Sequence, residues 1–98
     1  MRAIVIEGPG SLALRDLPRP EVPEGWALVK VEAVGVCGSD LHAYRGDQPF
    51  FRYPRVPGHE ATGVVVEGPS EWVGRRVALD PAVPCGRCRA CLQGRENC

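Results

Sequence analysis

The stretch that decides the fold is residues 26–36, Trp-Ala-Leu-Val-Lys-Val-Glu-Ala-Val-Gly-Val, which continues into Cys-Gly-Ser-Asp-Leu-His at residues 37–42. Apolar residues at 27, 29, 31 and 33 alternate with charged residues at 30 and 32, which is the period-two pattern of a half-buried strand. The Gly-Val-Cys-Gly corner predicts that the thiol of Cys37 projects from a strand end. Residues 39–44 predict one short helical turn with Ser39 or Asp40 as its N-cap.

The rest of the chain predicts further short strands joined by turns. Residues 3–7 and 12–15 flank the turn cluster Gly-Pro-Gly-Ser and predict an opening hairpin, while residues 62–67 and 73–79 predict two more strands. Prolines at 18, 20 and 23 favour an extended connector over residues 17–25. With 12 glycines and 10 prolines, the composition favours a mostly β fold, a small barrel or sandwich with candidate ligands on its loops.

Composition also narrows the function classes. The 98 residues suffice for one domain, and 12 basic residues balance 12 acidic ones, which argues against nucleic-acid partners. No signal-peptide or membrane-span pattern occurs, so the sequence predicts no membrane association and a cytoplasmic location. The chain ends on a candidate ligand, Cys98, which leads us to expect a fragment of a longer protein.

Residues 81–98, which we call the cysteine lobe, lack periodicity and carry four of the five cysteines, Cys85, Cys88, Cys91 and Cys98. Such short spacing lets thiolates converge on one ion, and four thiolates are typical of a structural zinc site. Free thiols or an iron–sulfur cluster are the alternatives. The spacing differs from the common ferredoxin motifs, so we favour zinc with a stabilising role.

A second cluster combines Cys37 with His59 and Glu60, which follow the corner Pro57-Gly58. Mixed ligands are typical of catalytic zinc, although a buried cysteine and a hydrogen-bonded histidine would leave the same pattern. Chemistry in the adjoining residues favours the metal interpretation. Ser39 is suited to accept a substrate proton, His42 to pass it to solvent, and Asp40 to orient a ligand histidine. A helix cap and a solvated surface histidine are the alternatives for these residues.

Three motifs together resemble the zinc-dependent medium-chain alcohol dehydrogenase family: residues 34–42, residues 53–63 and the cysteine lobe. The resemblance covers essentially the whole chain, in order. It implies the family's N-terminal catalytic domain, a GroES-like, partly open β-barrel with a small four-cysteine zinc lobe and few short helices. The form of residues 37–42 and of the loop at residues 46–53 is most similar to the polyol and sugar-acid branch, with sorbitol-, threonine- and galactonate-type enzymes.

The resemblance also implies roles for single residues. Cys37 and His59 would be catalytic zinc ligands, with Glu60 a direct or alternate ligand, and Ser39 and His42 would carry the proton away while Asp40 partners His59. The four lobe cysteines would hold structural zinc. The family pattern has one residue more between its last two lobe cysteines, and residues 64–76 are shorter than usual. The full-length enzyme would be an NAD(P)-dependent homo-oligomer that oxidises a small secondary alcohol or polyol.

The sequence also indicates what this chain lacks. No Gly-x-Gly-x-x-Gly follows a strand, so we expect the nucleotide-binding domain to be absent and the 98-residue chain to be inactive alone. Two other function classes remain open. One is a non-enzymatic zinc-binding interaction module, suggested by the arginines of the cysteine lobe. The other is a GroES-like chaperone subunit, which gives no reason for Cys37 and the pair His59-Glu60.

Overall fold

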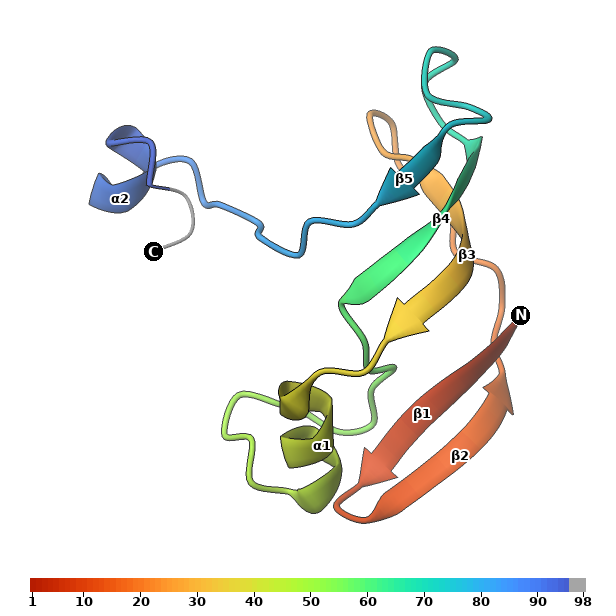
Figure 1. The fold of residues 1–98 in the computed structure, drawn as a ribbon, viewed down its shortest axis with the longest axis vertical. Coiled ribbons are helices and arrows are strands. Elements are labelled where there is room, and N and C mark those ends of the chain that lie inside the picture. The colour runs from red at the N-terminus through yellow and green to blue at the C-terminus, as the bar shows by residue number, and fades with distance from the viewer. Residues whose placement is uncertain (96–98) are drawn as a thin grey trace.

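The computed structural model describes residues 1–95 and contains two antiparallel sheets (Figure 1). Strands β1 (Arg2–Gly8) and β2 (Ser11–Asp16) form the first sheet, as the predicted hairpin. Strands β3 (Leu28–Gly35), β4 (Glu60–Glu67) and β5 (Arg76–Ala78) form the second in the order β3-β4-β5. The mostly β architecture is confirmed, and no closed barrel forms within residues 1–95.

Helix α1 (Gly38–Arg45) follows β3 directly and extends the predicted helical turn by a residue at each end. Its N-cap is Cys37, so the prediction of Ser39 or Asp40 at that position was wrong. The reason is that the Asp40 carboxylate reaches back from inside the first turn and accepts the backbone N–H of Cys37 at 3.0 Å. The helix ends at Gly46, whose left-handed conformation (φ 88°) suits a residue without a Cβ.

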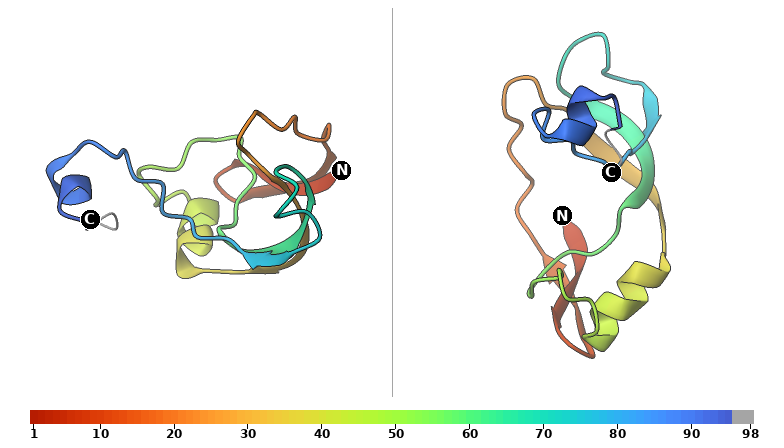
Figure 2. Two further views of the ribbon diagram at one scale, coloured as in Figure 1. Left: turned by 90° about the horizontal axis from the view of Figure 1, so that it is seen from above. Right: turned by 90° about the vertical axis from the view of Figure 1, so that its left-hand side faces the viewer.

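The buried core is small. It comprises Val5 and Ile6 of β1, Ala43 of α1, and Ala61 and Val65 of β4. The predicted half-buried face of β3 was wrong, since Val31 is 51% exposed and Ala33 is exposed as well, which leaves Val29 as the half-buried residue of that face within the strand. Two register irregularities in the β3–β4 ladder interrupt the alternation, and the two sheets diverge (Figure 2). The chain therefore exposes 7813 Å², whereas a compact protein of 10.6 kDa exposes about 5,500 Å².

Within the described part of the cysteine lobe, the segment around α2 (Arg89–Leu92) stands away from both sheets and follows an extended stretch of chain (Figures 1 and 2). The short helix α2 begins after Cys88, whose side chain accepts the backbone N–H of Cys91. None of the helices within residues 1–95 has the length and apolar character needed to cross a membrane.

Candidate metal centre and pocket

Two strand ends bring the first cluster together. The β3–β4 ladder pairs Gly35 with Glu60, so the chain leaves β3 toward Cys37 just where it enters β4 from His59. One ligand atom each of Cys37, His59 and Glu60 lies within 4.8 Å of the other two. The structure thus places Cys37 beside two residues that lie more than twenty positions later in the sequence.

Glycines leave room for this arrangement. A Cβ on Gly35 would lie 2.5 Å from Oε2 of Glu60, so any larger residue would force the glutamate carboxylate to move from its place in the cluster. Gly58 turns the chain before His59 with φ of 102°, a conformation that other residues rarely adopt. The Pro57-Gly58 corner and the end of β3 therefore act together to aim the ligand atoms at one point.

The electrostatics of the cluster favour a metal-binding thiolate. Hydrogen bonds from the Ser39 side chain and backbone, followed by one from His59, lower the pKa of Cys37. The hydrogen bond with Cys37 and the charge of Asp40 raise the pKa of His59 against the opposing effect of burial. A lowered thiol pKa makes the thiolate, which is the metal-ligating form, more abundant at neutral pH.

Asp40 lies between Cys37 and His59 and contacts both sides of the cluster. One carboxylate oxygen accepts the N–H of Cys37, and the other lies 3.9 Å from Nδ1 of His59, slightly beyond hydrogen-bonding distance. The Asp40 side chain is only 17% exposed, so its charge is poorly screened by water. This is the place that a residue orienting His59 would occupy.

His42 lies on the same side of α1 as Ser39, one helical turn later, and its side chain is 56% exposed. Its Nδ1 lies 2.9 Å from Oδ1 of Asp47, and both side chains are more than half exposed. The sequence interpretation missed Asp47. The helix-ending Gly46 just before it was the available signal, because the chain reverses there and returns Asp47 to the helix end, where its N–H bonds the carbonyl of His42.

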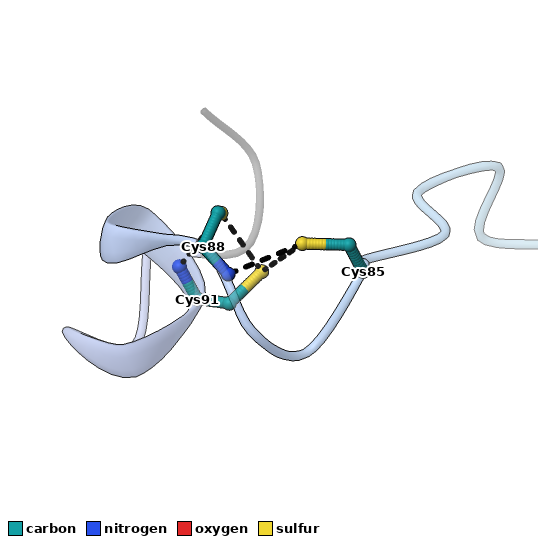
Figure 3. Close-up of side chains that lie close together, drawn as sticks. All are labelled: Cys85, Cys88 and Cys91. Carbon is teal, nitrogen blue, oxygen red and sulfur yellow. Dashed lines mark hydrogen bonds between the residues drawn. The ribbon is translucent and has the colours of Figure 1, made fainter.

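The cysteine lobe brings three of its four predicted ligands together (Figure 3). The Cys91 sulfur lies 3.4 Å from that of Cys88 and 3.8 Å from that of Cys85. Backbone N–H groups of Arg87 and Cys88 lower the pKa of Cys85 to about 7. Cys98, the fourth predicted ligand, lies outside the described residues.

A pocket of about 310 Å³ opens beside the first cluster. Its walls include Ser39, Asp40 and His59 on the cluster side, and Gln48, Phe50, Phe51 and Arg55 from the loop between α1 and β4. Of the aromatic residues in this loop, Tyr53 does not line the pocket; its hydroxyl donates to the carbonyl of Ala43.

Comparison with known proteins identifies the family. The model of the alcohol dehydrogenase GroES-like domain matches residues 23–98, so the chain belongs to this family. It is 50% identical to the starvation-sensing protein RspB of Escherichia coli over 99% of this chain, and 41% identical to the L-galactonate-5-dehydrogenase of the same organism over 100% of this chain. It spans 30% of the length of each of these relatives.

Comparison of the fold with solved structures leads to the same family. An alcohol dehydrogenase from Escherichia coli CFT073, crystallised with its cofactor NADH, matches with a TM-score of 0.80 and 43% identity. The match covers 99% of this chain and 29% of that one. These matches confirm the predicted resemblance to the zinc-type alcohol dehydrogenase family.

Proposed function

We propose that this chain is the zinc-binding catalytic domain of an NAD(P)-dependent alcohol or polyol dehydrogenase. The observation that carries the proposal is the convergence of Cys37, His59 and Glu60 beside a pocket of about 310 Å³. A thiolate, an imidazole and a carboxylate form a mixed donor set, and three protein ligands leave a position for substrate. Zinc bound at this cluster would supply Lewis acidity to a substrate oxygen.

The residues around the cluster would handle the proton. The Ser39 hydroxyl lies on the pocket wall next to Cys37, where it can accept the proton of a substrate hydroxyl. His42 lies one helical turn away with Nδ1 beside Asp47, so Nε2 is the ring nitrogen that would take the proton toward solvent. Asp40 would hold His59 in the orientation that ligation requires.

The cysteine lobe would hold a second, structural zinc. The three described sulfurs approach one another from a loop and from α2, and the lowered pKa of Cys85 favours its ligating form. Thiolate-only coordination leaves no open position, so this zinc would stabilise the lobe. The alternative, a non-enzymatic zinc module, accounts for this lobe but gives no reason for the cluster around Cys37.

A chimera tests the enzymatic proposal. Residues 1–98 replace the matching segment of the Escherichia coli L-galactonate-5-dehydrogenase, and formation of NAD(P)H is measured with a panel of alcohols, polyols and sugar acids. We expect turnover that Cys37→Ser abolishes and that Ser39→Ala lowers by about 10²–10⁴-fold. A folded, zinc-loaded chimera that oxidises none of these substrates would contradict the proposal. The isolated chain should turn over no alcohol.

A further inference from the structure

Most arginines that the structure describes have no carboxylate partner, and Arg55 is the one of them that lines the pocket beside the metal cluster. Arg15, Arg19 and Arg76 each lie within 3.3 Å of a glutamate carboxylate. Arg55 lines the pocket beside the metal cluster, and within residues 1–95 no carboxylate lies within ion-pair distance of its guanidinium. A guanidinium carries five N–H donors in a planar fork that matches a carboxylate.

Two backbone hydrogen bonds fix the position of Arg55. Its backbone N–H and carbonyl both pair with Ile6, at 3.0 and 2.8 Å, and Ile6 is only 2% exposed. Its guanidinium carbon lies 5.4 Å from the centre of the Phe51 ring, and that ring contacts Tyr53 edge-to-face at 5.0 Å. The backbone of this exposed arginine is therefore fixed and its guanidinium lies over an aromatic face before any ligand arrives, which lowers the entropy lost on binding.

The other charges facing the pocket leave this guanidinium available. Asp40 is the acidic residue of the pocket wall. One of its carboxylate oxygens accepts the Cys37 N–H, and the other faces His59. Glu60 belongs to the metal cluster. Gln48 supplies a half-buried amide to the same wall, and amides bind hydroxyl groups as donor and acceptor.

We propose that Arg55 binds the carboxylate of the substrate, so that the pocket selects a small polyhydroxy acid over a neutral polyol. This inference rests on the proposed function, because the hydroxyl to be oxidised lies at the Cys37, His59 and Glu60 cluster while the carboxylate lies at Arg55. The pocket volume of about 310 Å³ is at the small end of ligand sites, which span about 300–1,000 Å³. A compact substrate therefore fits this pocket better than a bulky one, and the choice between acid and neutral polyol depends on Arg55.

The test uses the zinc-loaded 98-residue chain and two matched probes. D-Gluconate and D-sorbitol differ in a terminal carboxylate in place of a hydroxymethyl group, and their dissociation constants are measured by titration of ¹H–¹⁵N spectra. We expect gluconate to shift pocket signals and Arg55→Ala to weaken its binding by about tenfold or more. Sorbitol binding should stay unchanged. Arg55→Lys keeps the positive charge but loses the planar pair of donors, so its gluconate dissociation constant should lie between those of wild type and Arg55→Ala.

Arg52→Ala is the control, because Arg52 is an exposed neighbour that does not line the pocket and its loss changes the net charge equally. It should leave both dissociation constants unchanged. The inference is overturned if Arg55→Ala binds gluconate as well as wild type, if Arg52→Ala weakens binding equally, or if gluconate shifts no pocket signal up to its solubility limit. The zinc content of the same samples reports separately on the proposed function. Repeating the comparison of the arginine variants on zinc-free chain separates carboxylate binding at Arg55 from zinc binding at the Cys37 cluster.

Discussion

Gly63→Ala tests how strictly the backbone is packed behind the metal cluster. Gly63 lies in the central strand β4, opposite Val31 of β3 and Val77 of β5. An added Cβ would overlap the Lys30 carbonyl oxygen and lie 2.8 Å from Cγ1 of Val29, closer than real Cβ contacts come. Because the obstacle is mainly backbone and both neighbouring strands hydrogen-bond to β4, the methyl group has no easy direction in which to move.

The expected cost is that of an overpacked core, about 1–3 kcal/mol of unfolding free energy. For a domain of this size each kcal/mol lowers Tm by about 4–8 °C, so we expect a decrease of about 4–24 °C by circular dichroism. Gly8→Ala is the matched control, because a Cβ there meets no atom within 4 Å. A Gly63→Ala variant that melts together with Gly8→Ala would refute the packing argument. Glu60 lies three residues before Gly63 on β4. The Gly63→Ala change should therefore lower the zinc affinity of the Cys37 cluster before it affects that of the cysteine lobe.

Two further predictions concern the ligands. In reduced, metal-free chain the iodoacetamide reaction of Cys85 should reach half its maximum rate near pH 7, because its pKa lies at about 7, whereas in urea the midpoint should approach 9.0. At pH 7 the gain in thiolate outweighs the lower nucleophilicity and gives roughly fivefold faster modification than in the unfolded chain; a folded rate still rising tenfold per pH unit above 8 would contradict this. Asp40→Asn removes the carboxylate beside His59, so zinc affinity at the Cys37 cluster should fall about 10–100-fold in a chelator competition while the cysteine lobe keeps its affinity. Equal losses at both sites would point to general destabilisation instead.

The sequence predicted those parts of the fold that local pattern determines. Turn residues between alternating runs specify the β1–β2 hairpin, and the strand-end corners at Cys37 and His59 correctly suggested that these residues meet. The meeting could be suggested because neighbouring antiparallel strands join the end of one to the start of the next. The pairing of Gly35 with Glu60 provides this contact in the structure.

Other features depend on long-range packing that no local pattern encodes. Alternation predicts that one face of β3 is apolar, but it does not say whether another element covers that face, and the diverging sheets leave Val31 and Ala33 exposed. Side-chain direction is equally hidden, which is why Asp47 beside His42 and Arg55 in the pocket were missed. The cap of α1 depended on the carboxylate of Asp40 reaching backward, a choice that the sequence leaves open.

The central claim is that two chemically different clusters of this one chain each hold a zinc ion. Native mass spectrometry of freshly reduced, zinc-loaded chain measures it most directly. We predict about two zinc ions per chain, one lost on Cys37→Ser and the other on Cys91→Ser. A single ion that survives Cys37→Ser and disappears with Cys91→Ser would contradict the claim, and would leave the cysteine lobe as the chain's metal site.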